Sequence, residues 1–240
     1  DLVNDDTSFP IYSTHLNTFY AFPDTFPILN LDFYASAADF NHQTQVVILK
    51  LLSCVKKCHD IFAYQNIQHL IFSGISGDKP NKLMVYSIRA LINFLKENKD
   101  QFEEIYLSED LIFILNHLIL NFPYIIKSDA GYLLSLLIFQ FPQYLITHIL
   151  FQSSEIDIKE AIYNVLCNDR TAILIQMLYG LDSLKIFSLQ ESIFDQFIFQ
   201  IQETNILDLV FDLIYHDNLE VAKIARIIYQ EINDLIESQS

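Results

Sequence analysis

The chain has 240 residues, with 30 acidic against 14 basic side chains and a formal net charge of −16. A surface this acidic repels phosphate backbones, so the composition argues against a nucleic-acid partner and favours basic peptides or proteins. Hydrophobic residues make up 52% of the chain, which excludes disorder. The 4 Gly and 6 Pro are too few for the many tight turns of an all-β fold.

The first forty residues differ from the rest of the chain. Residues 1–40 are rich in proline and aromatic residues and lack a clear hydrophobic period. We expect an irregular N-terminal extension or a degenerate repeat there, followed by a helical repeat domain over 41–240. The acidic and polar amino terminus does not have the pattern of a secretory signal peptide. The 3 cysteines form no disulfide framework, which favours a reducing compartment.

Helical patterns alternate with short breaks along the rest of the chain. Ser108 and Ser128 offer oxygen acceptors at helix starts. Pro80, Pro123 and Pro142 mark breaks, because proline disfavours helix in the residue before it. The predicted helices span 41–58, 65–74, 82–97, 108–121, 128–139, 142–152, 157–167, 169–180, 188–202, 205–216 and 219–236.

One stretch has the length of a membrane span. Residues 130–154 contain no Asp, Glu, Lys or Arg. However, Pro142 interrupts the apolar run between Gln140 and Gln143, so two short buried helices joined at Phe141-Pro142 explain the pattern better than one span. We therefore expect no membrane span.

The helices form a repeat. The middles of every second predicted helix recur at intervals of about 30 to 45 residues, the range of helical solenoids. These midpoints are Ile88, Leu134, Ile162, Phe194 and Ile224. Each unit is expected to be a helix pair that buries its apolar face only against stacked neighbours. The last helix, 219–236, has a cleaner polar face, which is typical of a terminal repeat.

No local pattern predicts catalysis, a metal or a cofactor. Cys54 and Cys58 lie one helical turn apart beside His59, but no second ligand pair is near in sequence, so free buried thiols are favoured over zinc. The glycine-containing loop 73–82 lacks the preceding strand and the Lys-Ser/Thr ending of a phosphate loop. A nucleophile signature such as G-x-S-x-G is also missing. We expect a protein that is not an enzyme.

Two stretches resemble a known family. Ser87–Phe94, SIRALINF, resembles the third helix of an armadillo repeat, typified by A-L-R-A-x-x-N-hydrophobic. Leu207–Ile228, LDLVFDLIYHDNLEVAKIARII, is similar to the final repeat of importin-alpha (karyopherin-alpha). The resemblance covers about Asn81–Glu237 and, more weakly, the predicted helix over 41–58. It implies an all-α, right-handed superhelical solenoid of armadillo-type repeats, in a short and divergent relative of importin-alpha.

The resemblance also implies a peptide-binding groove. In importin-alpha, Trp and Asn lie one helical turn apart on the concave face, where the Trp ring stacks on a bound lysine and the Asn amide holds the peptide backbone. The matching pairs in this chain are Arg89 with Asn93, Tyr132 with Leu136, and Tyr163 with Cys167. The groove candidates are therefore Arg89, Asn93, Tyr132 and Tyr163. By the same resemblance, the acidic Asp217 and Glu220 of the last repeat are candidate contacts for an export receptor.

Structural alternatives stay open for each candidate. The Asn93 side chain could equally donate a hydrogen bond to a neighbouring backbone carbonyl, and the two tyrosines could simply pack against neighbouring helices. Arg89 would serve to pair with an acidic side chain. The acidic residues Asp217 and Glu220 would serve solubility.

The sequence predicts two alternative functions. The first is an importin-alpha-like adaptor, cytoplasmic and nuclear, that recognises basic, extended polypeptide segments and works with nuclear transport receptors in protein import. Its binding is expected to weaken with salt. The second is a structural scaffold that holds one fixed protein partner through a largely apolar interface, without binding nuclear-localisation signals.

Overall fold

A computed structural model describes residues 42–54, 65–75, 79–150 and 157–239. The chain divides into two units, Asp1–Phe40 and Asn41–Ser240. Every described residue belongs to the second unit. The extension or degenerate repeat predicted for residues 1–40 therefore lies outside the described residues.

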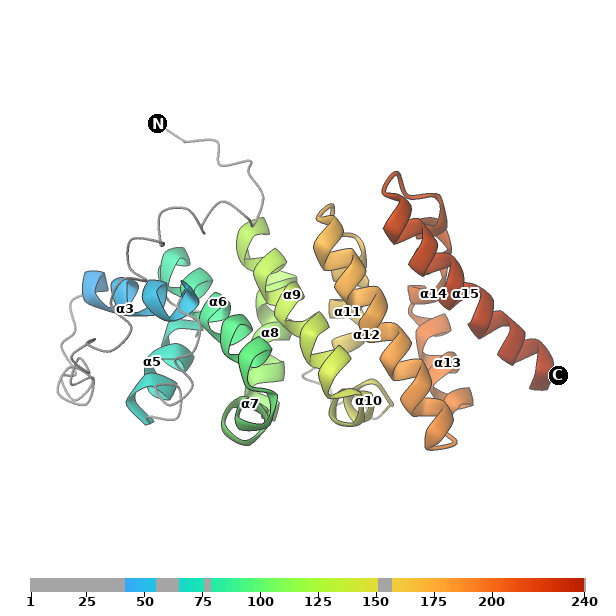
Figure 1. The fold of residues 1–240 in the computed structure, drawn as a ribbon, viewed down its shortest axis with the longest axis horizontal. Coiled ribbons are helices and arrows are strands. Elements are labelled where there is room, and N and C mark those ends of the chain that lie inside the picture. The colour runs from blue at the N-terminus through green and yellow to red at the C-terminus, as the bar shows by residue number, and fades with distance from the viewer. Residues whose placement is uncertain (1–41, 55–64, 76–78, 151–156, 240) are drawn as a thin grey trace. The chain divides into compact units, whose positions relative to one another are not determined.

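All regular elements of the described ranges are helices, and no strand occurs within those ranges (Figure 1). The all-α prediction is therefore confirmed. The helices are α3 (His42–Cys54), α5 (Gln65–Ile75), α6 (Asn81–Glu97), α7 (Lys99–Tyr106), α8 (Glu109–Asn121), α9 (Tyr124–Gln140), α10 (Pro142–Leu150), α11 (Ile158–Leu166), α12 (Thr171–Gln190), α13 (Phe194–Glu203), α14 (Ile206–Asp212), the 3-10 helix η1 (Leu213–Tyr215) and α15 (Leu219–Gln239).

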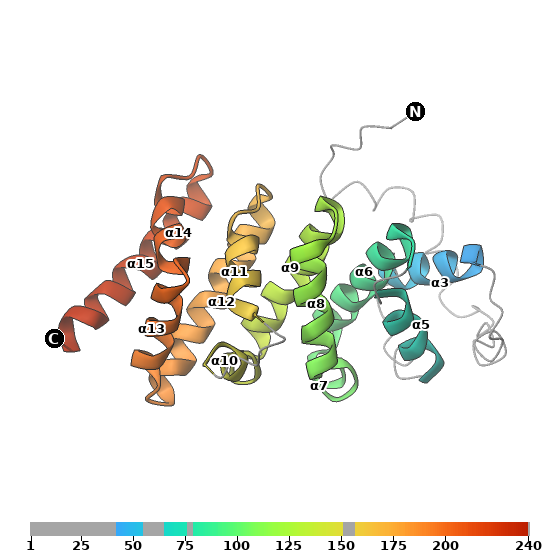
Figure 2. The ribbon, with the colours of Figure 1, turned by 180° about the vertical axis from the view of Figure 1, so that it is seen from behind.

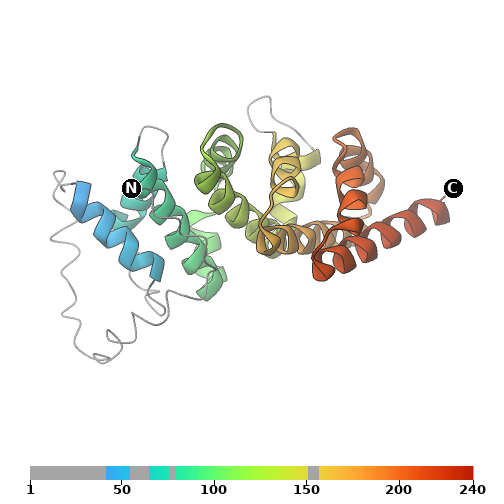
Figure 3. The same ribbon diagram turned by 90° about the horizontal axis from the view of Figure 1, so that it is seen from above.

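The helices of this unit are arranged in two layers. The long helices α6, α9, α12 and α15 pack on one another in succession, and α3 packs on α6. We call α6, α9, α12 and α15 the long-helix layer. The shorter helices α8, α11 and α14 also pack in succession, and α10 packs on α13. Figure 2 shows this second layer from behind, and Figure 3 shows the two layers from above.

The repeating unit has three helices, so the predicted helix pair is wrong. Two short helices precede each long one: α7 and α8 come before α9, α10 and α11 before α12, and α13 and α14 before α15. Ile88, Leu134 and Ile224 lie in the long-helix layer as expected. Ile162 lies in α11 and Phe194 in α13, so these two midpoints belong to the other layer.

Helix α7 was not predicted, because its acidic sequence reads as a loop. Asn98 caps it by accepting a hydrogen bond from the Gln101 backbone N–H through its side chain at 3.2 Å. Phe102 and Tyr106, four residues apart, are fully buried against Phe94. Burial raises the pKa of Tyr106. Two aromatic anchors one turn apart therefore hold this short, charged helix in place.

Helix α12 runs without a break from Thr171 to Gln190, where the sequence predicted two helices separated near Gly180. The glycine does not end the helix. A Cβ atom built on Gly180 would lie 3.0 Å from Ile138 Cγ2 and 3.3 Å from the Ser135 carbonyl oxygen. Gly180 thus serves the close approach of α12 to α9, a role that sequence alone does not distinguish from a helix end.

The predicted break at Phe141-Pro142 is confirmed, because α9 ends at Gln140 and α10 begins at Pro142. The two helices meet at 107°, although together they have the length and hydropathy of a membrane span. In the part of the chain that the structure describes, α12 is the one single helix long and apolar enough to cross a membrane, and 50% of its most apolar window is buried.

Neighbouring units are linked by polar side chains as well as by the apolar core. The Asn93 side chain donates to the Leu52 carbonyl at 3.1 Å, Asn168 donates to Ser128 Oγ at 3.2 Å, and Lys159 Nζ donates to Gln200 Oε1 at 2.5 Å. The partners are 40 or 41 residues apart in each case, which is one unit of the repeat. Each satisfied bond contributes about 1 kcal/mol, so apolar burial supplies most of the stability and these bonds fix the register between units.

Candidate binding surface on the long helices

The long helices can be aligned by counting residues from their first turn. The ninth residues are Arg89, Tyr132, Tyr179 and Ile227. The thirteenth residues are Asn93, Leu136, Ser183 and Glu231, and the sixteenth are Lys96, Phe139, Ile186 and Asp234. The ninth, thirteenth and sixteenth positions share one side of a helix, because they are separated by four and three residues.

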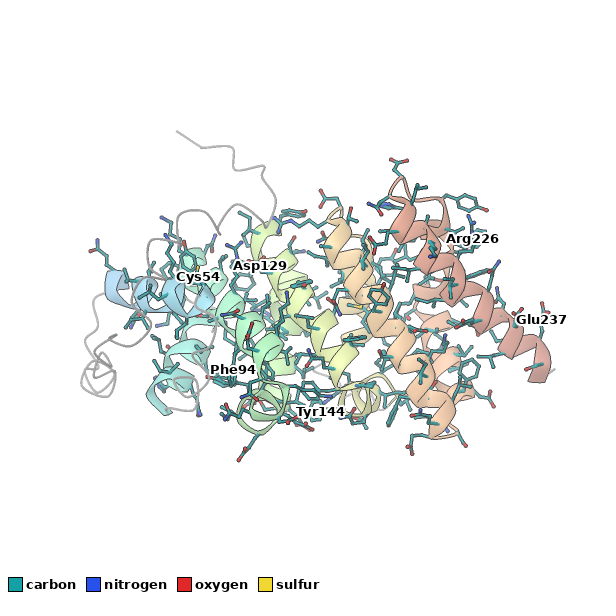
Figure 4. All side chains as sticks on the ribbon, in the orientation of Figure 1. Cys54, Phe94, Asp129, Tyr144, Arg226 and Glu237 are labelled. Carbon is teal, nitrogen blue, oxygen red and sulfur yellow. The ribbon has the colours of Figure 1, made fainter. Side chains whose placement is uncertain are left out.

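Arg89 lies in an ion pair between α6 and α9. Its Nε donates to Asp129 Oδ2 at 2.7 Å, and Arg170 Nη1 lies 3.9 Å from Asp129 Oδ1. The Asp129 side chain is only 3% exposed, whereas Arg89 is 30% exposed. Burial raises the pKa of Asp129 above its usual value, against the opposing effect of Arg89 and Arg170. Figure 4 marks Asp129 on the amino-terminal half of α9.

The alternatives that the sequence left open for Arg89 and Asn93 both correspond to contacts in the structure. Arg89 pairs with an acidic side chain, and Asn93 donates to the backbone carbonyl of Leu52 in α3. Leu136, at the matching position of α9, is buried and offers no amide. The α6 end of the long-helix layer therefore uses its polar groups to join helices within the chain.

Tyr132 and Arg89 occupy the same position in successive long helices, as the sequence predicted. The Lys96 ammonium lies 4.7 Å from the centroid of the Tyr132 ring. This geometry is a cation–π contact, and it places a lysine of the chain itself on the ring face that was assigned to a bound lysine.

Tyr163 does not join the other three candidates. It lies in α11, a helix of 9 residues in the second layer, and its side chain is 36% exposed there. The spacing of Tyr163 and Cys167 matches the Trp-x-x-x-Asn spacing of the family, but Tyr163 lies in α11 and not in a long helix. Tyr179 of α12 takes the place that the sequence assigned to Tyr163. The match becomes visible when residues are counted from the helix starts in the structure, Asn81, Tyr124 and Thr171.

At two junctions the sixteenth residue of one long helix contacts the ninth residue of the next. The sixteenth residue of α6, Lys96, contacts the ninth residue of α9, Tyr132. The sixteenth residue of α9, Phe139, contacts the ninth residue of α12, Tyr179, with ring centroids 6.4 Å apart. The corresponding residues of α12 and α15 are Ile186 and Ile227.

We call Phe139, Tyr179, Ile186 and Ile227 the junction stripe. Their exposed fractions are 45%, 41%, 47% and 44%, so all four are open to solvent despite their apolar character. Exposed large apolar groups that recur at matched positions mark binding surfaces more often than single scattered ones do. None of the four was a candidate from the sequence, because their shared position appears only when the long helices are aligned from the starts that the structure gives them.

Acidic groups lie beside the junction stripe. The buried Lys185 forms ion pairs with Asp182 at 2.6 Å and with Glu231 of α15. Burial lowers the pKa of Lys185, but hydrogen bonds and the charges of Asp182 and Glu231 outweigh burial and raise it above its ordinary value. The two carboxylates are 35% and 53% exposed, so this group carries one net negative charge at the surface.

Asp217 and Glu220 lie at the start of α15, and both are exposed. Between them, Asn218 caps the helix by accepting from the backbone N–H groups of Glu220 and Val221 at 2.9 and 3.2 Å. His216 Nδ1 accepts from the Asn218 N–H at 2.9 Å. The structure thus gives Asn218 and His216 a capping role and leaves the two carboxylates directed to solvent.

Within the described ranges, no group of three or more metal-ligating side chains comes together. Cys54 is half-buried and Cys167 is exposed, both as free thiols. Cys58 and His59, which completed the zinc alternative, lie outside the described residues.

No protein-family model matches this sequence, and no curated protein matches it either. The resemblance to importin-alpha therefore has no support beyond the motifs of Ser87–Phe94 and Leu207–Ile228 and the register of the helices between them.

Proposed function

We propose that this protein is an armadillo-type helical-repeat scaffold that binds another polypeptide along its long-helix layer. The observation that carries the proposal is the junction stripe, in which exposed apolar side chains recur at matched positions of successive long helices. A repeat of this kind suits an extended ligand, because each unit offers equivalent side chains to successive ligand residues. In this proposal the chain is neither an enzyme nor a membrane-spanning protein.

The architecture supports the proposal in a second way. A short first helix, a second helix and a long third helix recur three times, with the long helices stacked in one layer. This arrangement is compatible with the armadillo-type solenoid that the resemblance implied. Asp182 and Glu231, the partly exposed partners of Lys185, also favour a water-exposed repeat over a bundle of membrane spans, because carboxylates facing lipid are costly.

Selection from a phage-displayed library of random peptides tests the proposal. Peptides selected on the full chain are expected to bind wild type and to lose about tenfold in affinity to Tyr179→Ser, a loss of about 1.4 kcal/mol. Fluorescence anisotropy measures the affinities. Tyr163→Ser is the matched control, because Tyr163 is similarly exposed but lies in the other layer.

The two variants distinguish binding on the long-helix layer from binding elsewhere. Selected peptides that respond to Tyr179→Ser and ignore Tyr163→Ser support the proposal. Peptides that respond to Tyr163→Ser alone, or a selection that yields no specific binder, reject it. Far-ultraviolet circular dichroism of each variant confirms that the helices persist.

A second candidate function is favoured by charge. Residues 171–239 hold 11 acidic and 3 basic side chains, and Asp217 and Glu220 are exposed at the start of the last unit. We propose as this alternative an importin-alpha-like adaptor that carries basic cargo between cytoplasm and nucleus with the help of transport receptors. Arg89 and Asn93 weigh against it, because both are engaged inside the chain.

A lysine- and arginine-rich signal peptide tests the alternative directly. If the chain is such an adaptor, it should bind the basic peptide more tightly than a neutral peptide of the same length. Its affinity for the basic peptide should also fall as the salt concentration rises from about 50 to about 500 mM, because salt screens the attraction between charges. Equal binding of both peptides at every salt concentration rejects it.

A further inference from the structure

We infer that the junction stripe recognises a polyproline-II-like segment of a partner protein with two apolar side chains three residues apart and a lysine or arginine between them. The inference rests on the proposed function and specifies its ligand. It follows from the spacing of the exposed pairs and from the charges beside them.

The spacing comes from the packing of helices. Phe139 and Tyr179 form one apolar contact at the junction of α9 and α12, and Ile186 and Ile227 take the same positions at the next junction. Adjacent junctions in a helix layer are separated by about one interaxial distance, 8–10 Å. A ligand that crosses the layer must therefore present apolar side chains at about this interval.

A polyproline II segment meets that interval. It rises about 3.1 Å per residue with three residues per turn, so side chains three residues apart lie on one face about 9.3 Å from each other. In a β-strand, side chains on one face are about 6.6–6.8 Å apart, and every second one of them is about twice that distance away, so neither distance matches the interval. The helix spacing thus favours polyproline II over a strand.

The charge of the ligand follows from Asp182 and Glu231. Asp182 lies three residues after Tyr179 and four before Ile186, so it shares their face of α12. Both carboxylates remain partly exposed, and the single cation between them, Lys185, is 5% exposed. The two intervening residues of a polyproline II segment project to either side of the apolar face, where a lysine or arginine would meet this excess negative charge.

Three synthetic fluorescein-labelled peptides test the inference on the full chain. The first has two leucines three residues apart, prolines that favour polyproline II, and lysines between the leucines. The second has the same composition with the leucines two residues apart. The third keeps the spacing of the first and replaces every lysine with glutamate.

The first peptide is expected to bind about tenfold more tightly than each of the other two. Its affinity should fall about tenfold with Phe139→Ser and with Ile186→Ser, one variant for each junction, and should be unchanged in Tyr163→Ser. All three positions are exposed, so these variants keep the buried core intact.

Other results overturn the inference in distinguishable ways. Equal binding of the two leucine spacings, or binding of neither, rejects the spacing rule, while the phage selection with Tyr179→Ser still decides the proposed function. Binding that Phe139→Ser and Ile186→Ser leave unchanged places the peptide elsewhere and also rejects the inference. If sedimentation equilibrium finds a dimer that Ile186→Ser dissociates, a second copy of the chain covers the stripe instead.

Discussion

Helix α9 packs against α6 on one side and against α12 on the other, and the two junctions use different chemistry. Between α6 and α9, Arg89 pairs with the buried Asp129, and Lys96 lies over Tyr132. Between α9 and α12, Gly180 permits a close approach and Phe139 contacts Tyr179. The tenth residue of α9 is the buried Leu133, where α12 has Gly180.

This difference separates two ways of using the same position in a repeat. At the α6–α9 junction the charged residues at the matched positions, Arg89 and Lys96, contact side chains of α9 within the chain. At the α9–α12 junction Gly180 allows a close approach of the two helices, and the side chains at the matched positions, Phe139 and Tyr179, are exposed at the surface. In the proposed function the apolar junction is the binding surface, whereas the ion pair of Arg89 with Asp129, which we call the polar lock, joins α6 to α9.

Gly180→Val is expected to have the largest effect on stability. An added Cβ at this position would lie 3.0 Å from Ile138 Cγ2 and 3.3 Å from the Ser135 carbonyl oxygen, and valine adds two further methyl groups. We expect a loss of about 3 kcal/mol from overpacking, measured by urea unfolding. Ser183→Val, on the same helix but half-buried, is the control and should cost less than about 1 kcal/mol. Equal losses in the two variants would show that close approach does not hold this junction.

Arg89→Ala is expected to have the next largest effect, because it breaks the polar lock. It leaves the buried carboxylate of Asp129 with Arg170 alone, whose Nη1 lies 3.9 Å away. We expect a loss of about 2 kcal/mol, below the full cost of breaking a buried pair because Arg89 is partly exposed.

A double-mutant cycle isolates the pair. Arg89→Ala combined with Asp129→Ala should cost less than the sum of the single variants by about 1 kcal/mol or more, since the unpaired buried charge is then gone. Additive losses would mean that the two side chains contribute independently, and the contrast between the junctions would disappear.

Lys185→Met tests the α12–α15 junction, which combines both chemistries, and its effect should be smaller. The substitution removes the cation from between Asp182 and Glu231, but both carboxylates are exposed enough to be rehydrated. We expect a loss of about 1 kcal/mol by urea unfolding. Glu231→Gln, which leaves Asp182 as a partner for Lys185, is the comparison and should cost less. A larger loss from Glu231→Gln would assign the stabilisation to Glu231 and not to the buried lysine.

Much of the fold could be predicted from the sequence, because helix ends carry local signals. Proline fixed the breaks before α6, α9 and α10, and Ser108 accepts from the Leu111 N–H at the start of α8. The errors occurred where a local signal had a tertiary cause. Gly180 resembles a helix end but serves packing, and α7 resembles a loop until Phe102 and Tyr106 are seen buried in the core.

The candidate site was harder to predict, because it depends on which helices share a layer. Arg89, Asn93 and Tyr132 were placed on the long helices correctly, but Tyr163 was assigned by a short motif that occurs on a helix of the other layer. The partners of Arg89 and Asn93 lie one unit away in the chain, so their engagement becomes visible only when the units are stacked.

Asp129→Asn should have the smallest effect, and its pH dependence sharpens the meaning of the polar lock. Burial raises the pKa of Asp129 above 3.8 in the folded chain in spite of its two arginines. The folded state therefore holds the proton more tightly than the unfolded state, so this group's contribution to stability falls as pH rises from 3.8 through the folded pKa. Asparagine does not titrate, so Asp129→Asn should gain stability relative to wild type as pH rises through that window, ending within about 1 kcal/mol of wild type at neutral pH. Urea unfolding of both proteins between pH 3 and 7 measures the difference. A relative stability that moves the other way would mean that the arginines, rather than burial, control the Asp129 carboxyl, and that the lock stabilises the fold through charge as well as through shape.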